Sequence, residues 1–137
     1  MKAVRQAVID IGSNTVRLVV YAGLPRAPMP IYNEKSRVKL GACLAGDGEI
    51  DKATMKKALA ALARFETLAR AMQVDSMRVV ATAATREAKN GHELVEKAAA
   101  LGIRVDVLDG NAEATAAGYG VLSDNPFANG YVGDLGG

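Results

Sequence analysis

The chain has 137 residues, of which 50% are hydrophobic and 23% charged, a composition typical of one folded domain and not of a disordered segment. Its formal net charge of +2 is too small to indicate a nucleic-acid or membrane partner. The single cysteine, Cys43, excludes an internal disulfide, and neither a bilayer-length apolar run nor a signal-peptide pattern occurs, so we expect a cytoplasmic location.

Two apolar runs near the N-terminus predict a tight antiparallel hairpin. The expected strands are residues 4–11 and 15–24, and only the short turn at residues 12–14 separates them. Three prolines within residues 23–30 predict a loop. Residues 31–40 alternate imperfectly and carry many charges, which favours an edge strand with one face in water.

The middle of the chain changes from a helical pattern to a strand pattern. Residues 41–48 are expected to be flexible, and Asp51 is placed to cap the helix that follows. That helix is predicted over residues 52–73, where apolar residues recur at helical spacing. Residues 77–82 are rich in apolar and β-branched side chains and predict a strand, and the uninterrupted apolar centre at residues 79–81 suggests that both of its faces are covered, as in a parallel sheet.

The last third continues the alternation of helices and strands. The expected elements are a turn or short helix over 85–89, a helix over 92–101, a strand over 103–108, a helix over 112–122 and a strand over 130–135. The whole order predicts an α/β lobe on a mixed five-stranded sheet, with three antiparallel strands, then parallel βα units, and helices on both faces.

We expect two unequal parts. Residues 1–125 form the lobe, and residues 126–137 form a linker and the first strand of a second, truncated lobe.

One short pattern occurs twice: an apolar strand, an aspartate and a glycine turn. Asp10 precedes the turn at residues 12–14, and Asp134 precedes Gly136 and Gly137. A carboxylate at a strand end can hold Mg²⁺, and backbone N–H groups in the turn can hold phosphate oxygens. The alternative is that Asp10 only caps its own turn. The repeat favours the interpretation that the chain is one half of a two-lobed enzyme that acts on phosphate compounds, together with the first strand of the other half.

Three segments should meet at the carboxyl edge of the sheet, because ligands of such sheets bind beyond the strand ends. They are Asp10 with its turn, residues 82–86 and residues 109–113. Together they supply an acid, a glycine turn, the cation Arg86 and a second acid, a combination that suits phosphoanhydride hydrolysis. Arg86 could instead be a solvated residue at a helix start, and Glu113 a favourable first-turn charge.

Other charged or reactive side chains have simpler interpretations. Arg17 is a surface charge or, if strand alternation directs it toward the cleft, a phosphate ligand. His92 is expected at the surface, because no second ligand stands at metal spacing, and Cys43 is expected to pack as a small hydrophobic residue. The charged run at residues 33–39 is an edge strand in water, which could also contribute to a route for a polyanion.

The chain resembles the exopolyphosphatase and guanosine pentaphosphate phosphohydrolase (Ppx/GppA) family in four segments that occur in the family's order. These segments are residues 8–18, 79–91, 107–114 and 133–137. The resemblance spans the whole chain and implies a ribonuclease-H-like lobe of the actin-like ATPase superfamily. It also implies release of terminal phosphate from inorganic polyphosphate, or of the 5′ phosphate of guanosine pentaphosphate, with a divalent metal such as Mg²⁺.

The resemblance further implies a role for each site residue. Asp10 and Asp134 would bind the metal across a cleft. Glu113, which precedes an alanine as the family's catalytic glutamate does, would orient or deprotonate the attacking water, and Arg86 would bind the phosphate chain. The residues that would hold phosphates are Gly12, Ser13, Asn14, Arg17, Gly136 and Gly137.

Two departures from the family pattern bear on activity. Ala112 replaces the first of two adjacent acids, and the family continues into a complete second lobe. We therefore expect the isolated lobe to be a weak or inactive catalyst, since a one-walled cleft cannot exclude water. An open edge on the last strand would allow a homodimer. The alternative functions are an ATP-dependent kinase or ATPase of the same superfold, and a non-catalytic phosphate-binding domain.

Overall fold

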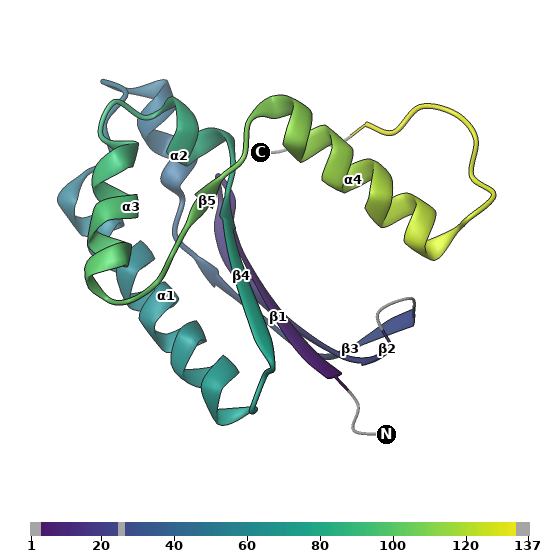
Figure 1. The fold of residues 1–137 in the computed structure, drawn as a ribbon. Coiled ribbons are helices and arrows are strands. Elements are labelled where there is room, and N and C mark those ends of the chain that lie inside the picture. The colour runs from purple at the N-terminus through teal and green to yellow at the C-terminus, as the bar shows by residue number, and fades with distance from the viewer. Residues whose placement is uncertain (1–3, 25–26, 134–137) are drawn as a thin grey trace.

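A five-stranded sheet forms the centre of the molecule (Figure 1). The computed structural model describes residues 4–24 and 27–133. The strands, in the spatial order β3-β2-β1-β4-β5, are β1 (Val4–Ile11), β2 (Thr15–Leu24), β3 (Ala27–Arg37), β4 (Ser76–Ala81) and β5 (Asp106–Val107). The first three strands are antiparallel, and β4 and β5 run parallel to β1. The predicted mixed sheet is confirmed.

Helices cover one face of this sheet closely. Figure 1 shows α1 (Lys52–Ala71), α2 (Ala83–Glu87) and α3 (Gly91–Ala100) on that side, and the 3₁₀ helix η1 (Leu40–Ala45) precedes α1. The Asp51 carboxylate accepts hydrogen bonds from the N–H groups of Ala53 and Thr54, so it caps α1 as predicted.

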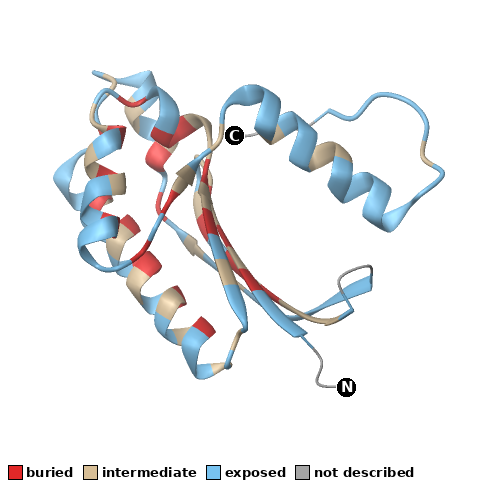
Figure 2. Ribbon diagram, viewed as in Figure 1, coloured by how far each residue is buried: buried red, intermediate tan, exposed pale blue. Residues whose placement is uncertain are grey.

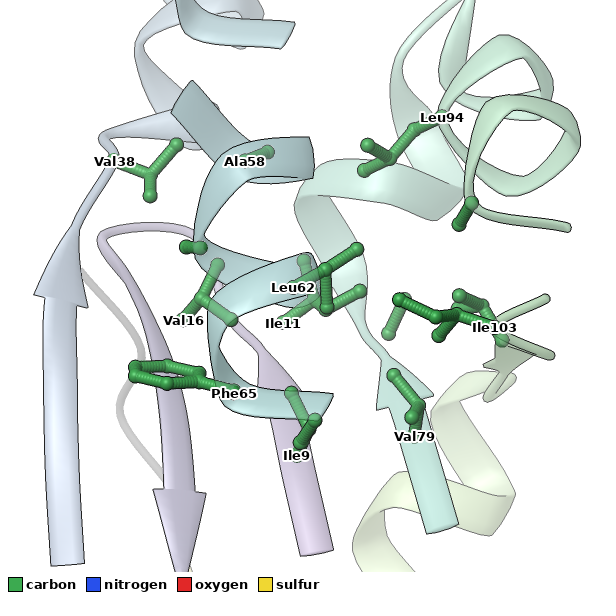
Figure 3. Packing of buried hydrophobic residues seen from close by; sticks show 14 of the residues in the cluster. Ile9, Ile11, Val16, Val38, Ala58, Leu62, Phe65, Val79, Leu94 and Ile103 are labelled. Atoms are coloured by element: carbon green, nitrogen blue, oxygen red, sulfur yellow. The ribbon is translucent and has the colours of Figure 1, made fainter. Parts of the chain in front are cut away.

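The hydrophobic core lies between these helices and the sheet (Figures 2 and 3). Alternate residues of β1 and β2 point into it because successive side chains of a strand face opposite ways. The largest side chains without solvent exposure are those of Phe65, Ile9, Ile11, Leu18, Leu40, Leu62, Leu94, Val16 and Val20. The other face of these two strands is therefore free to carry polar chemistry.

The helix α4 (Gly110–Asp124) lies on the opposite side of the sheet, so helices occupy both faces as predicted (Figure 1). None of its residues is buried, and Figure 2 shows it mostly exposed, with short stretches of intermediate burial. Residues of the sheet and of α4 line a common pocket instead of packing into a second core. None of the described helices is long and apolar enough to cross a membrane.

The predicted loop at residues 23–30 is wrong in its second half, because β3 begins at Ala27. Pro28 and Pro30 pair in register with Gly23 and Tyr21 of β2. Proline lacks an N–H donor, but β3 is at the sheet edge, where a missing donor can be tolerated. β3 then ends at Arg37 and not at residue 40, because Lys39 adopts φ 64°.

The predicted strand at residues 103–108 is reduced to Asp106–Val107, which pair with β4. Ile103 and Val105 are buried but belong to no strand. The predicted strand at residues 130–135 is absent over residues 130–133, and its remainder lies outside the described residues. A strand needs a neighbour for its hydrogen bonds, and no described strand pairs with residues 130–133. The boundary near residue 125 stays a prediction.

Replacing Phe65 by alanine should lower the free energy of unfolding by about 3–5 kcal/mol, because the ring is fully buried and would leave a cavity. Denaturant unfolding followed by circular dichroism measures the change. Met29→Ala is the matched control, since Met29 is 69% exposed on β3, and its effect should stay within about 0.5 kcal/mol. Equal losses in the two variants would contradict this core.

Candidate active site

A pocket of about 830 Å³ lies at the carboxyl ends of β1 and β4, between the sheet and α4. Parallel strands end at the same edge, so the loops that follow β1 and β4 meet there. The polar side chains that line the pocket are those of Asp10, Ser13, Thr82 and Glu113. Apart from Glu113, the α4 wall is made of small residues, among them Ala114, Ala116 and Ala117.

Asp10 reaches the pocket because of the alternation in β1. Its neighbours Ile9 and Ile11 are fully buried on the α1 side, so Asp10 faces the other way and is half-buried. The sheet register places Asp10 opposite Arg17 of β2 and beside Val80 of β4. Partial burial of a carboxylate costs free energy unless favourable partners offset it, so an aspartate at this position is more typical of a functional site than of a structural one.

The segment that follows β3 donates backbone hydrogen bonds to the turn after Asp10. The carbonyl of Ser13 accepts a hydrogen bond from the N–H of Gly41 at 2.7 Å. The carbonyl of Asn14 accepts from the N–H groups of Val38 and Lys39 at 3.0 and 2.9 Å. Within the described residues, the N–H groups of Ser13 and Asn14 donate to no protein acceptor. Such donors in a glycine turn can bind an anion.

Gly41 approaches this turn so closely that only glycine fits. A Cβ atom at residue 41 would lie 2.9 Å from the Cβ of Ser13. The sequence gives no sign of this role, because the contact joins residues that are far apart in the chain. Gly41 is therefore a site residue that sequence reasoning missed.

Arg86 and Glu113 meet at the side of the pocket. The Nη1 atom of Arg86 donates to the Leu108 carbonyl at 2.7 Å and to Glu113 Oε2 at 3.3 Å, while Nη2 lies 3.4 Å from Glu87 Oε1. The side chains of Arg86 and Glu113 are about one third exposed, at 30% and 32%. The guanidinium thus ties α2 to the start of α4, where Asp109 caps the helix through the N–H of Ala112.

A second glycine, Gly91, fixes the position of α2. A Cβ atom at residue 91 would lie 1.9 Å from the carbonyl oxygen of Thr85, the residue before Arg86. Gly91 begins α3, so this close approach sets how α2 and its arginine sit against α3. Sequence reasoning treated Asn90 and Gly91 only as an interruption between two helices and missed this contact.

The structure brings together most of the predicted site residues that it describes. Asp10, Gly12, Ser13 and Glu113 line one pocket, and Arg86 contacts Glu113.

Asn14 and Arg17 are exposed and do not line the pocket, although both stand beside residues that do. Asp134, Gly136 and Gly137 lie outside the described residues.

The fold and the pocket define a ribonuclease-H-like lobe with a glycine turn and two carboxylates at one sheet edge. The chain belongs to the Ppx/GppA phosphatase family, whose model matches residues 19–137. The match begins within β2, so Asp10 and its turn precede it.

Individual relatives agree with this assignment. A guanosine-5′-triphosphate,3′-diphosphate pyrophosphatase of Photobacterium profundum is 29% identical over 116 residues, which are 84% of this chain and 23% of that protein. The Aquifex aeolicus member of the Ppx/GppA family superposes with a TM-score of 0.85 and 26% identity, covering 90% of this chain and 41% of that chain.

A third relative, an exopolyphosphatase from Cytophaga hutchinsonii, has a TM-score of 0.78 and 32% identity, covering 85% of this chain and 38% of that one. The chain therefore spans about a quarter to two fifths of the length of these relatives.

Gly91→Ala and Gly118→Ala should change stability in opposite directions. The first adds a Cβ against the Thr85 backbone and should lower the free energy of unfolding by about 1–3 kcal/mol or more. The second adds a Cβ with no atom within 4 Å inside α4, where alanine is favoured over glycine by about 0.5–1 kcal/mol. Thermal unfolding of both variants measures the difference, and a tolerated Gly91→Ala would contradict the close α2–α3 contact.

Proposed function

We propose that the full-length protein is a phosphoanhydride hydrolase that releases terminal phosphate from inorganic polyphosphate or the 5′ phosphate of guanosine pentaphosphate. The observation that carries this proposal is one pocket lined by Asp10, the glycine turn and Glu113, with Arg86 in contact with Glu113. Family membership supports it, as do relatives named as an exopolyphosphatase and a guanosine-5′-triphosphate,3′-diphosphate pyrophosphatase.

The first task of the site is to hold a terminal phosphate. The N–H groups of Ser13 and Asn14 can donate to its oxygens, and charge-assisted bonds of this kind are stronger than neutral ones. A guanidinium has five N–H donors, and the contacts of Arg86 within the described residues occupy three of them. The other two can bind the phosphate chain without breaking the contact with Glu113.

The second task is to activate water. The Glu113 carboxylate lines the pocket and is held in place by Arg86, so it can accept a proton from a water molecule beside the bound phosphate. The water oxygen forms a bond to the terminal phosphorus as the bond from that phosphorus to the bridging oxygen breaks. The shortened chain leaves with the bridging oxygen, and inorganic phosphate is the other product.

The donor set at the pocket suits Mg²⁺, which usually takes one or two carboxylates and completes its shell with water and substrate phosphates. Asp10 would hold the ion, and Asp134, the expected second ligand, lies outside the described residues. No group of three or more His, Cys, Asp or Glu residues within the described part forms a site made by protein alone. When bound, the cation would offset the negative charge that develops on the phosphate oxygens.

We also infer that the 137-residue chain alone is a weak catalyst. The α4 wall of the pocket has no buried residue, so water has access from that side. We also propose that the protein is cytoplasmic and that it can form a homodimer.

Glu113→Gln in the full-length protein should lower kcat for phosphate release from polyphosphate by at least about 100-fold, because the base is lost while the shape of the side chain is kept. A colorimetric phosphate assay measures it. Glu96→Gln, which alters an exposed glutamate of α3, should retain normal turnover. Normal turnover in Glu113→Gln would remove Glu113 from this role.

Metal dependence can be tested independently of the base. Chelation with EDTA should abolish phosphate release and added Mg²⁺ should restore it. Asp10→Asn should raise the Mg²⁺ concentration needed for half-maximal activity by about tenfold or more, since a neutral amide is a poorer ligand than a carboxylate. Activity that survives chelation, or an unchanged Mg²⁺ requirement in Asp10→Asn, would contradict the metal role of Asp10.

A further inference from the structure

We propose that the pocket-side face of β2 and β3 is a second phosphate-binding surface, which holds the distal phosphates of an extended polyphosphate chain whose end occupies the pocket. We call it the β3 basic surface and define it by Arg17, Lys35 and Arg37. Arg17 is already expected to hold phosphate, and this proposal adds Lys35 and Arg37. The inference rests on the proposed function and adds a preference for long chains.

Strand alternation sorts the charges of β3 onto two faces. Tyr32, Glu34 and Ser36 are half-buried, whereas Asn33, Lys35 and Arg37 are exposed. Glu34 accepts a hydrogen bond from the Tyr32 hydroxyl and forms an ion pair with Arg64 of α1. These two partners hold the pKa of the Glu34 carboxyl below its usual value, the Tyr32 hydrogen bond most strongly.

The acid of β3 is thus committed to the α1 side. Leu18, which pairs with Glu34, is fully buried on that side, so the register agrees with the exposure. Lys35 and Arg37 lie on the opposite face of β3, where Glu34 cannot neutralise their charge.

The sheet register then gathers the cations beside the pocket. Residues directly opposite each other in an antiparallel pair point to the same face. Arg17 lies opposite both Asp10 of β1 and Lys35 of β3, and Arg37 lies opposite Thr15, the first residue after the turn. The three cations therefore share the face on which Asp10 reaches the pocket.

Within the described residues, the acid on this face of β1, β2 and β3 is Asp10, which lies opposite Arg17, and no acid lies opposite Lys35 or Arg37. Lys35 and Arg37 form no ion pair there, and the Nε atom of Arg17 donates to the neutral side chain of Asn33 at 3.0 Å. Like charges directly opposite each other destabilise a sheet, and Arg17 and Lys35 form such a pair. An anionic ligand on this face would relieve that repulsion.

The position of the surface fits a linear polyanion that starts in the pocket. Neighbouring strands are about 4.8 Å apart, so the surface extends roughly 10 Å from β1 to the open edge of the sheet. Successive phosphates of one chain would meet successive cations along that path. The nearest neighbours of these cations along β2 and β3 on the same face, Thr15, Val19 and Asn33, are not aromatic, whereas proteins that bind single-stranded nucleic acid use aromatic side chains to stack bases.

The test compares long-chain polyphosphate with tripolyphosphate in the full-length protein. The double variant Lys35→Gln/Arg37→Gln should raise KM for the long chain about 5- to 10-fold, because two phosphate contacts are lost, and KM for tripolyphosphate less than about twofold. The slope of log(kcat/KM) against log[salt] for the long chain should become shallower by about 1.5. Circular dichroism checks that the variant is folded.

The matched control is Lys56→Gln/Lys57→Gln. Both lysines are exposed on α1, on the other side of the sheet, and their loss changes the net charge by the same amount. This variant should leave KM for both substrates unchanged. An equal effect in the two double variants, or an equal effect on both substrates in Lys35→Gln/Arg37→Gln, would overturn the proposal.

The remaining outcomes separate this proposal from the proposed function. If the wild-type protein hydrolyses both substrates and Lys35→Gln/Arg37→Gln does not differ from it, the β3 basic surface is wrong and the hydrolase stands. If the wild-type protein hydrolyses neither, calorimetric titration with long-chain polyphosphate decides, and weaker binding by the double variant supports the surface alone. Single-stranded RNA that binds more tightly than polyphosphate, and loses affinity in the double variant, would overturn the assignment to polyphosphate.

Discussion

The site depends on the alternation of side chains along β1. Ile9 and Ile11 are fully buried beneath α1, which fixes the register of the strand and directs Asp10 to the opposite face. A slip of one residue would place the carboxylate in the hydrophobic core and expose two isoleucines, so the apolar packing enforces the position of the polar group. The pocket, the glycine turn and the parallel strand β4 are all arranged around this one orientation.

Long-range contacts then bring the other segments to Asp10. The segment after β3 bonds to the carbonyl groups of the turn, and Arg86 ties α2 to the beginning of α4. Two glycines permit close backbone contacts around the site. Gly41 lies against Ser13 of the turn, and Gly91 at the start of α3 lies against Thr85 of α2. The site of this Ppx/GppA family member is therefore assembled from separate strand ends that the core holds in fixed relation. The same alternation that orients Asp10 also separates Glu34 from the cations of β3, so one rule of sheet geometry shapes both the pocket and the face beside it.

Much of the fold follows from patterns that span only a few residues. The bounds of β1 and β2, the cap of α1 at Asp51 and the end of α3 before Gly102 were predicted from apolar runs, a capping side chain and a glycine. The mixed sheet was predicted from the order of its elements, and the rule that parallel strands end at one edge placed Asp10 and Glu113 close together. These features depend on local conformational preference and on periodicity, which the sequence displays directly.

Tertiary structure alone decided the features that depend on a distant partner. Residues 27–30 extend β3 despite two prolines because β2 lies beside them, and β5 is reduced to two residues because only those pair with β4. The contact between Arg86 and Glu113, the approach of Gly41 to Ser13 and the shared face of Arg17, Lys35 and Arg37 also join residues far apart in the chain. A residue's local sequence sets what it prefers, but hydrogen-bonded pairing and close packing are decided by whichever segment the whole fold brings against it.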